Sequence, residues 1–461
     1  MATKPKIVTL TNSSVEVLNA IRNAASTNYQ NYVPVATDDA EVIKKIGAVL
    51  MDFPALQNEF LSALVNRIGK VLITSKSYTN PWAMFKRGLL DFGESVEEIF
   101  VELAKPFEFD PSGAENTVFK REIPDVRSAF HVLNYQKYYK TTVSREELRQ
   151  AFVSVDGVNN LISKIVDSLY TGMNYDEFLT MKYLLAQNII NGMLRTKTVD
   201  TSNPKATVQA VKSTSNKLTF LNADNNFAGV HTHTLKDDQY VLINADFQAT
   251  MDVEVLANAF NMSKAEFMGH QILVDGFGEL DVARLNVLFA DDPTYTAPDA
   301  TTLAALNAIP LVVVDRDYFM IFDKTLMMTD IYNGEGLYWN YWLHSWKVFS
   351  TSPFAQAVVF VPTSSGVTSV TITPSAVTEP SGWVGTLNLG VAVVTTGFAD
   401  KRVKWSIVSS SDDIEASINA AGVLKVTDND ETSAATITVT ATSVYDPTVT
   451  GTATITFSAA E

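Results

Sequence analysis

Hydrophobic and polar residues alternate in blocks between Leu311 and Val361, and these blocks predict the sheet around which the chain is organised. The apolar and aromatic blocks are residues 311–314, 318–322, 338–346 and 354–361. Polar turn sequences separate them at 315–317 and 333–336. Apolar runs of this length are typical of buried strands. We therefore predict three or four strands of one central sheet.

The N-terminal region has a mixed pattern. The apolar spacing of residues 15–25 predicts a short helix, and residues 29–34 are predicted to be extended. A further helix is predicted to begin at Asp52, because Asp is favoured as an N-cap and Pro54 fits the first helical turn. Its apolar positions keep a period of about 3.6 residues as far as Ile68.

The region 157–193 carries apolar stripes with helical spacing, and we predict two helices there. The second begins at Asn174, because Glu177 three residues later completes a capping box. Residues 200–310 are predicted to mix helix and strand. The expected elements are a strand at 241–243, a strand and turn at 274–277, and helices that start at Asp252 and Ser263.

Residues 70–140 lack the periodic apolar positions that a core needs. Strands are predicted at 71–74 and 99–103, with polar and basic sequences between and after them. Such an arm buries little apolar surface by itself, and burial is the main stabilising contribution in folding. We therefore predict an extended arm that lies on a partner surface.

From residue 367 to 458 the pattern changes to short strands in which apolar residues alternate with Thr or Ser. Many short strands at this spacing predict a β-sandwich. Trp405 is its predicted core anchor. Residues 362–366 are predicted to be a linker in front of it.

Charge and composition exclude several classes of protein. A net charge of −16 argues against a basic surface that grips nucleic acid. The chain has no cysteine, which excludes disulfides and thiol chemistry. No apolar run approaches the roughly 18–20 residues of a membrane span, and we expect no signal peptide after Met1.

Candidates for catalysis or metal binding are few. His231 and His233 could place two imidazoles on one face of a strand, but surface or loop histidines explain them more simply. Asp315 and Asp317 could act as paired carboxylates, but a turn between buried strands explains them too. His344 is expected to be a hydrogen-bonded core residue. We predict no enzyme activity, no metal and no cofactor.

Aromatic and basic residues are expected to serve the structure. The aromatic block could stack bases or sugars, but no basic residue is interleaved in it. The predicted core residues are Tyr338, Trp339, Tyr341, Trp346 and Trp405. The basic residues predicted to pair with acids of a neighbouring subunit, with solvated charge as the alternative, are Lys86, Arg87, Lys120 and Arg121.

Several short sequences follow one another in an order typical of one family. They include Tyr32-Val33-Pro34, Val96-Glu97-Glu98-Ile99, Phe119-Lys120-Arg121-Glu122, Ala257 to Met262, Val274-Asp275-Gly276-Phe277, Asp317-Tyr318-Phe319-Met320, and Gly336 to Tyr341 with His344 and Trp346. In these the chain resembles the major capsid proteins of small podophages of the phi-twenty-nine group. Val403-Lys404-Trp405-Ser406 and Gly422-Val423-Leu424 resemble a bacterial Ig-like domain of group 2.

The resemblance implies an α+β fold of the HK-97 type, the fold of tailed-phage capsids, followed by an all-β Ig-like sandwich. It implies a capsid-fold domain at 1–361, a linker at 362–366 and the Ig-like domain at 367–461. The implied parts of the first domain are an N-arm (about 1–50), an E-loop (about 70–140), a P-domain with its spine helix (about 157–193) and an A-domain (about 200–345).

The implied function is that of a major capsid protein, whose copies form pentamers and hexamers of an icosahedral or prolate shell. This shell, the head of the virion, encloses double-stranded DNA without sequence-specific binding. The implied partners are other copies of the chain, and a scaffolding protein and a portal during assembly in the host cytoplasm; no membrane takes part. The alternative from the residues is a surface adhesin or carbohydrate-binding protein with an Ig-like module.

Overall fold

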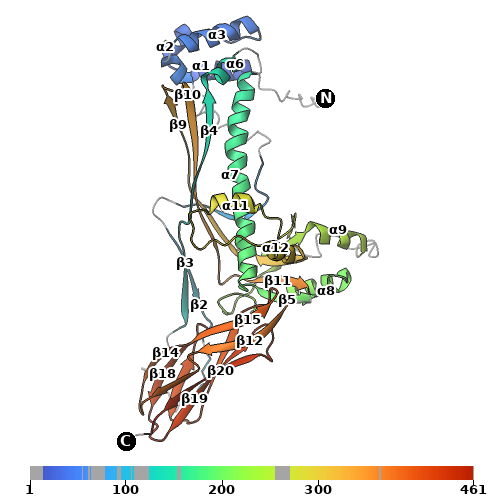
Figure 1. The fold of residues 1–461 in the computed structure, drawn as a ribbon, viewed down its shortest axis with the longest axis vertical. Helices are drawn as coiled ribbons and strands as arrows, with labels where there is room; N and C mark the ends of the chain where they lie inside the picture. The colour runs from blue at the N-terminus through green and yellow to red at the C-terminus, as the bar shows by residue number, and fades with distance from the viewer. Residues whose placement is uncertain are drawn as a thin grey trace. The chain divides into compact units, whose positions relative to one another are not determined.

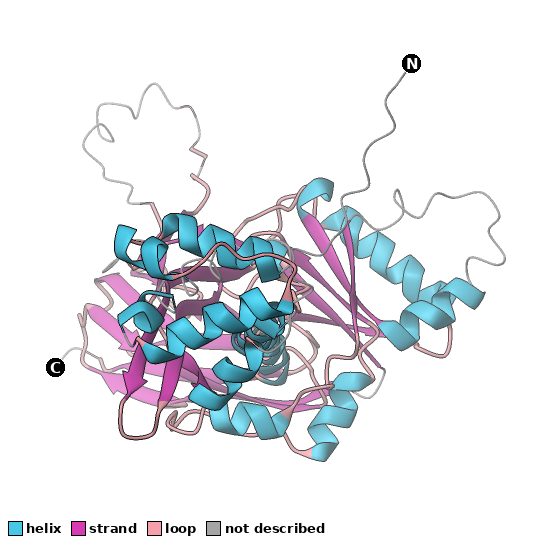
Figure 2. Ribbon diagram, turned by 90° about the horizontal axis from the view of Figure 1, so that it is seen from above, coloured by secondary structure: helices cyan, strands magenta, loops and turns pink. Residues whose placement is uncertain are grey.

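The structure is a computed structural model that describes residues 14–53, 55–60, 63, 78–90, 95–104, 106–107, 109, 124–152, 157–254, 270–362 and 365–459. Helices and strands are both abundant, as the cyan and magenta ribbons of Figure 2 show. The contacts divide the chain into two compact units. Unit 1 comprises Met1–Glu94, Val132–Phe178 and Ile321–Val348, and unit 2 comprises Ser95–His131, Leu179–Met320 and Phe349–Glu461. Each unit is therefore built from segments that are far apart in the sequence.

The N-terminal region of unit 1 is helical. Its helices are α1 (Ser14–Ala24), α2 (Thr27–Tyr32) and α3 (Ala40–Asp52), and residues 55–60 are helical too. The helix expected at 15–25 is confirmed, but the prediction of an extended chain at 29–34 is wrong. Ser26 caps α2, and the side chain of Arg22 donates to the carbonyl oxygens of Gln30 and Val33 at its end. These bonds satisfy the free backbone groups of a very short helix.

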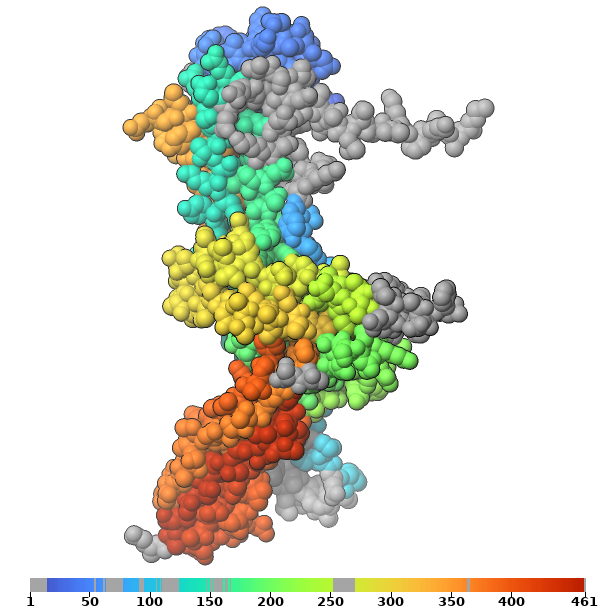
Figure 3. Space-filling model, turned by 45° about the vertical axis from the view of Figure 1, so that its right-hand side comes forward, coloured from blue at the N-terminus to red at the C-terminus, as the bar shows by residue number. Residues whose placement is uncertain are grey.

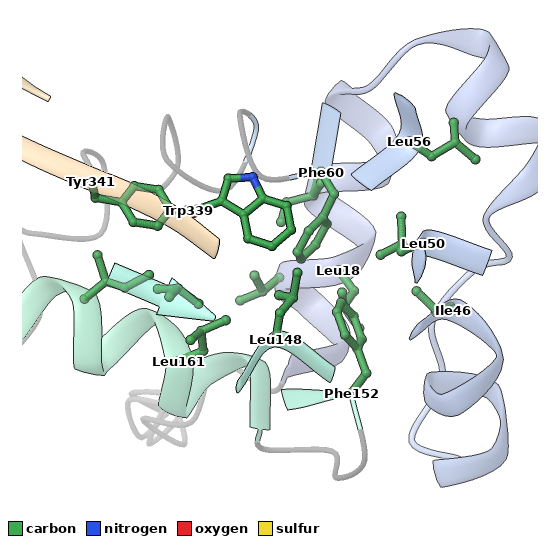
Figure 4. Close-up of a cluster of buried hydrophobic side chains, with 14 of the residues drawn as sticks. Leu18, Ile46, Leu50, Leu56, Phe60, Leu148, Phe152, Leu161, Trp339 and Tyr341 are labelled. Carbon is green, nitrogen blue, oxygen red and sulfur yellow. The ribbon is translucent and has the colours of Figure 1, made fainter. Parts of the chain in front are cut away.

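A large hydrophobic core lies in unit 1. It joins the N-terminal helices to α6 (Arg145–Ala151), the first half of α7 (Gly157–Ile190), β4 (Tyr135–Ser144) and β10 (Tyr338–Thr351). Trp339 and Tyr341 of β10 lie in it with Phe60, Leu148 and Phe152 (Figure 4). The segment predicted as an N-arm therefore forms part of the core of its own chain.

The sheet of unit 1 has the strand order β1-β9-β10-β4, in which β1 is Lys86–Leu89 and β9 is Phe319–Asn333. β1 runs parallel to β9, and β10 runs antiparallel to β4 with Trp342 opposite Lys140. The 3-10 helix η1 (Ala83–Phe85) precedes β1 and buries Phe85 beside Trp82. Trp82 and Phe85 are thus buried, although they fall in the region expected to lack a core.

α7 is a single helix of 34 residues, so the prediction of two helices at 157–193 is wrong. Asn174 does not cap a second helix; its side chain donates to the carbonyl oxygen of Tyr78. Glu177 points to a cluster of charged side chains instead of back to Asn174. Gly172, the residue most adverse to helix here, costs only about 1 kcal/mol relative to Ala. Packing of the apolar stripes against the core outweighs that cost.

The sheet of unit 2 has the strand order β5-β11-β8-β6-β7. Its strands are β5 (Arg195–Val199), β6 (Gln239–Asn244), β7 (His270–Val274), β8 (Leu311–Asp315) and β11 (Ala357–Pro362). The apolar blocks between Leu311 and Val361 form strands as predicted, but the prediction of one central sheet is wrong. β8 and β11 lie in this sheet, whereas β9 and β10 lie mainly in that of unit 1. Apolar periodicity reports burial and leaves the pairing partner open.

Helices accompany this sheet. They are α8 (Pro204–Lys217), η2 (Lys236–Asp238), α9 (Ala245–Glu254), α11 (Val282–Leu288) and α12 (Ala300–Asn307). α8 and α9 pack on the sheet through a core that includes Val211 and Phe247. Asp252, predicted to start a helix, lies near the end of α9, whose first turn is capped by the side chain of Asn244 accepting from the amide of Asp246; the residues that follow Glu254 lie outside the described ones. Ser263 lies outside the described residues.

The C-terminal residues of unit 2 form an all-β region, drawn orange to red in Figures 1 and 3. Its strands are β12 (Gly366–Thr373), β13 (Ala376–Glu379), β14 (Gly385–Asn388), β15 (Gly390–Thr396), β16 (Val403–Ser409), β17 (Ile414–Ile418), β18 (Val423–Asn429), β19 (Ala435–Ser443) and β20 (Thr450–Phe457). Their orders are β12-β15, β14-β18-β17 and β13-β20-β19-β16. Only Leu389 separates β14 from β15, so they act as one interrupted strand and join the first two groups in a row.

Candidate functional site

A β-hairpin of unit 2 lies in the segment predicted as an extended arm. It consists of β2 (Val96–Val101) and β3 (Val126–His131), paired antiparallel with Glu97 opposite Phe130 and Val101 opposite Val126. Burial alternates along both strands, so the hairpin has one face toward its own chain and one face toward solvent.

The face toward solvent carries four large apolar side chains beside Glu97 and Ser128. Ile99, Val101, Val126 and Phe130 are 53–64% exposed. Beyond the end of β2, Phe109 is 95% exposed. An uncovered apolar surface of this kind usually marks a protein interface, and this hairpin is therefore the strongest candidate for a functional surface.

The opposite face fixes the hairpin to its own unit. Phe100 stacks on Phe354 with ring centroids 5.6 Å apart. Arg127 donates to the carbonyl oxygen of Ala228. The Nδ1 atom of buried His131 lies 2.8 Å from the hydroxyl of Ser350. These contacts hold the apolar face in a fixed orientation relative to unit 2.

The histidine and aspartate candidates have structural surroundings. His231 Nδ1 lies 2.7 Å from Glu102 Oε1. Burial raises the pKa of Glu102, but hydrogen bonds from Leu103 and His231 outweigh this and hold it below its usual value. Within the described residues no three His, Asp or Glu side chains are placed to hold a metal ion. The described helices also include none that is long and apolar enough to cross a membrane.

Asp315 is the last residue of β8 and Asp317 lies in the turn after it, close to what the simpler interpretation predicted. Asp315 accepts from the backbone amide of Asp317 at 2.8 Å and from the hydroxyl of Thr234. Burial raises the pKa of Asp315. His344 is half-buried, and its Nε2 lies 3.4 Å from the hydroxyl of Thr329. These groups serve the turn and the sheet.

The aromatic side chains of the block 338–346 alternate between buried and half-buried along β10, as expected for a strand. Trp339 and Tyr341 are 2% and 0% exposed, as expected for core residues, whereas Tyr338, Trp346 and Trp405 are half-buried. The block has no interleaved basic residue in the sequence, yet strand pairing supplies one. The ammonium group of Lys140 on β4 lies 5.7 Å from the centre of the Trp342 ring. Trp405 packs against the core of the C-terminal region from its edge.

A buried cluster of four charges in unit 1 was not predicted. Lys347 on β10 contacts Glu177 on α7, and its Nζ lies 2.5 Å from Asp323 on β9. Lys86 on β1 lies 2.6 Å from Asp323 and 3.2 Å from Glu177. The side chains of Glu177 and Lys347 are 2% and 4% exposed. The charges therefore tie α7 to three strands of the sheet.

One of the basic residues predicted to contact a neighbouring subunit belongs to this cluster. The ammonium group of Lys86 binds carboxylates of its own chain. Arg87 is exposed on β1. Lys120 and Arg121 lie outside the described residues. No local sequence pattern predicts the cluster, because its members are up to 261 positions apart and meet only through the fold, as Lys86 and Lys347 illustrate.

The pKa shifts in the cluster predict a pH window for its contribution to stability. Burial raises the pKa of Asp323, but Lys347 and Lys86 outweigh this and lower it. Burial lowers the pKa of Lys86, but Glu177 and Asp323 outweigh this and raise it. The Asp323 contribution is present above its unfolded pKa of about 3.9 and is lost as pH falls through the lower folded value. The Lys86 contribution is present below about 10.4 and is lost as pH rises through the higher folded value.

We therefore expect Asp323→Asn to destabilise the protein by a constant amount between about pH 5 and 9. The difference should shrink as pH falls below about 4, because Asp323 then takes up a proton in the unfolded wild type and, at still lower pH, in the folded protein. Urea unfolding of both proteins across this pH range measures it. A difference that stays constant down to pH 2 would contradict a folded-state pKa shift as its cause.

A second group of buried charges attaches the C-terminal region to the rest of unit 2. Asp400 is fully buried and accepts hydrogen bonds from the guanidinium of Arg402 at 2.5–3.1 Å. Arg195 on β5 lies 3.7 Å from the same carboxylate. Arg402 also donates to the carbonyl oxygens of Asp224 and Asn226. β11 ends at Pro362 and β12 begins at Gly366, and the amide of Phe398, two residues before Asp400, donates to the hydroxyl of Ser365 in the connection between them.

Comparison with protein families gives a match over most of the chain. Residues 18–361 match the family described as Phi29-like phage major capsid protein. The chain is 33% identical to the major capsid protein of Bacillus phage PZA over 426 residues, which cover 91% of this chain and 88% of the relative. It is 34% identical to that of Bacillus phage B103 over 426 residues, covering 90% and 88%.

Solved structures give a more distant similarity. A chain in the capsid structure of Staphylococcus phage Andhra is similar with a TM-score of 0.49 and 16% identity, covering 63% of this chain and 86% of that chain. A chain in the structure of head fiber and inner core protein gp22 of native bacteriophage P68 has a TM-score of 0.49, 15% identity and the same coverages.

Proposed function

Because the chain belongs to the Phi29-like phage major capsid protein family, we propose that its copies form pentamers and hexamers of a shell around double-stranded DNA. The function of the chain is that of a major capsid protein of a tailed bacteriophage, and its place is the capsid of the virion. The family is structural and its members are not enzymes. The adhesin alternative is not supported.

The outward face of the β2–β3 hairpin is the observation that supports self-assembly. Ile99, Val101, Val126 and Phe130 are large apolar side chains held toward solvent. Burying one such side chain is worth about 1.5–3 kcal/mol. We infer that the hairpin covers an adjacent copy of the chain, as expected of an E-loop. A shell repeats each contact many times, so contacts of modest strength suffice together.

The domain boundaries follow as part of the proposal. The capsid-fold domain would span residues 1–361, the linker 362–366 and the C-terminal domain 367–461. With β14 and β15 counted as one strand, the C-terminal orders β12-β15/β14-β18-β17 and β16-β19-β20 correspond to the strand orders A-B-E-D and C-F-G. This order supports an Ig-like sandwich. A scaffolding protein, a portal and assembly in the host cytoplasm complete the proposal.

The hairpin proposal is tested with a double variant, Ile99→Ser with Phe130→Ser. We expect the chain to fold, because both side chains face solvent, but shell formation to be lost. Each of the two substitutions should weaken the contact between neighbouring copies by about 1.5–3 kcal/mol. Electron microscopy and sedimentation of the purified protein, with scaffold supplied if wild type needs it, measure shell yield, and circular dichroism reports folding.

A matched control is Leu273→Ser with Val287→Ser, since these side chains of unit 2 are 61% and 75% exposed. The control should assemble like wild type. Wild-type shell yield from the hairpin variant would show that this face is not an assembly contact. A wild-type protein that stays monomeric with every assembly partner present would overturn the proposed self-assembly.

A further inference from the structure

A cleft in unit 2 lies beside the C-terminal region and has a volume of about 800 Å³. Apolar side chains form much of its lining, among them Phe227, Phe354, Leu389, Trp405 and Ile418. The hairpin contributes Arg127 and Ser128 to one wall. The start of β16 and the turn after β17 form the wall on the C-terminal region.

The charge of this cleft is opposite to that of the chain as a whole. Arg127, Lys401, Arg402 and Lys404 line it, against Asp224 as the one acid among the lining residues of the described chain. Behind the lining, buried Asp400 pairs with Arg402 and lies 3.7 Å from Arg195, and Asp125 pairs with Arg127. A positive excess remains in a protein whose net charge is −16. Lys404 lies 2.5 Å from Asp224, but its side chain is 64% exposed, so a ligand can still reach it.

The far end of the C-terminal region is acidic. It is formed by the connections from β16 to β17 and from β18 to β19, which a hydrogen bond from the amide of Asp430 to the carbonyl oxygen of Asp413 joins. The acids of these connections and the adjoining strand ends are Asp412, Asp413, Glu415, Asp428, Asp430 and Glu431, and residues 409–416 and 427–434 contain no Lys or Arg. Nearby Val384 is 54% exposed.

One chain cannot bring these two surfaces together. β16 begins at the cleft with Val403 and ends at the acidic end with Ser409. At about 3.3 Å per residue, a strand of this length holds its ends roughly 20 Å apart. Complementary surfaces that a rigid module keeps apart fit a head-to-tail contact between copies.

We propose that the cleft binds the acidic end of the C-terminal region of a second copy, with Lys401 and Lys404 facing its carboxylates. The inference rests on the proposed self-assembly and adds a specific contact to it. A head-to-tail contact uses different surfaces on the two copies, so it propagates around rings or across a shell. Opposite charges also guide the approach and reject wrong orientations.

The first test is carbodiimide cross-linking of assembled wild-type shells, which joins a lysine amine to a carboxylate in direct contact. Mass spectrometry should identify links from Lys401 or Lys404 to Asp412, Asp413 or Asp430. Mixed shells of isotope-labelled and unlabelled chains should show that these links join two copies. Shells without such links, or with these lysines joined to the hairpin or to another protein, would overturn the inference and leave the proposed function standing. Absence of shells would overturn both.

A charge exchange provides the second test. Lys401→Glu should lower the yield of these links at Lys404 roughly tenfold, because attraction at the contact becomes repulsion. Asp413→Lys should do the same, and shells of the double variant should recover. Glu335→Lys in the turn between β9 and β10 of unit 1 is the control and should leave the yield unchanged. Equal yields from all variants would overturn the inference, and melting curves identify any variant that fails to fold.

Discussion

Lys347→Met should destabilise unit 1 by about 3–5 kcal/mol, the cost typical of removing one partner of a buried ion pair. The substitution keeps most of the aliphatic stem but removes the ammonium group. Of the two ammonium groups in the described cluster, that of Lys86 then remains for both Asp323 and Glu177, whose side chain is 2% exposed. Two carboxylates close to one ammonium group in a buried site leave a negative charge without compensation. The loss is large relative to the roughly 5–15 kcal/mol that stabilises a folded domain.

Hydrogen exchange of β10 peptides, with urea unfolding of the unassembled protein, measures this effect in unit 1. Lys44→Met is the control, because Lys44 pairs with Glu41 on the exposed face of α3, with side chains 51% and 79% exposed. Such a pair is worth about 0–1 kcal/mol. Adding Glu177→Met to Lys347→Met should recover part of the loss, since the stranded charge is removed with its partner. Equal stability of Lys347→Met and the Lys44 control would contradict a tightly coupled cluster.

The sequence predicted the elements better than their partners. Leu311–Val314 is buried on both faces, so its apolar run is sufficient to predict a strand. The same reasoning gave β9 and β10, yet placed them in one sheet with β8. β10 pairs instead with β4, a strand about two hundred positions earlier, with Tyr338 opposite Ser144. Pairing over that distance is decided by the packing of unit 1 as a whole and is not visible in the local pattern.

Local capping rules failed where tertiary contacts compete for the same side chains. Asn174 and Glu177 have the spacing of a capping box, but their side chains bind Tyr78, Asn80, Lys86 and Lys347. A buried carboxylate gains more from two ammonium groups than from a backbone amide that a continuous helix already satisfies. For the same reason Lys86, which resembles a solvent-exposed base in the sequence, could not be assigned to its own chain in advance.

The candidate surfaces likewise include parts that the sequence can predict and parts that only the fold determines. The arm predicted from 70 to 140 remains a prediction: β2 and β3 hold apolar side chains toward solvent, whereas Trp82 and Phe85 in the same range are buried. The basic cleft could not be predicted, because its lining comes from residues 127 to 444. Arg402 and Lys404 are separated by one residue, yet one binds buried Asp400 and the other exposed Asp224. Only the fold distinguishes their roles.

Asp400→Ala should weaken the attachment of the C-terminal region by about 3–5 kcal/mol, because it strands two guanidinium groups. Arg402 loses a carboxylate that accepts from its guanidinium through both oxygens at 2.5–3.1 Å. Arg195 loses the same carboxylate, which lies 3.7 Å away. Burial lowers the pKa of Arg195, and Asp400 opposes that shift in the wild type. Without Asp400, separation of the C-terminal region from the rest of unit 2 is therefore favoured, because it returns both guanidinium groups to water.

The damage should stay at the attachment. The core of the C-terminal region consists of strand residues such as Ile437, Ile455 and Phe457, and Asp400 is not among them. Heating should therefore show an early loss of the attachment and a later transition for the β-strands. Proteases should cut between residues 362 and 366 faster than in wild type. Glu415→Gln, an exposed position on β17, is the control and should shift stability by no more than about 0.5 kcal/mol.

This outcome bears on whether residues 367–461 act as an independent domain. A domain joined only by its linker would show no change at 362–366 on loss of Asp400. In the structure Thr196 also donates to the carbonyl oxygen of Phe398 at 2.8 Å, and Arg195 to that of Val444 at 2.6 Å. A chain that ends at Val361 should therefore still fold, but with β5 uncovered and with shells less stable than those of the full chain. If Asp400→Ala instead unfolds the C-terminal β-strands together with the sheet β5-β11-β8-β6-β7, the C-terminal region and the rest of unit 2 form one cooperative body.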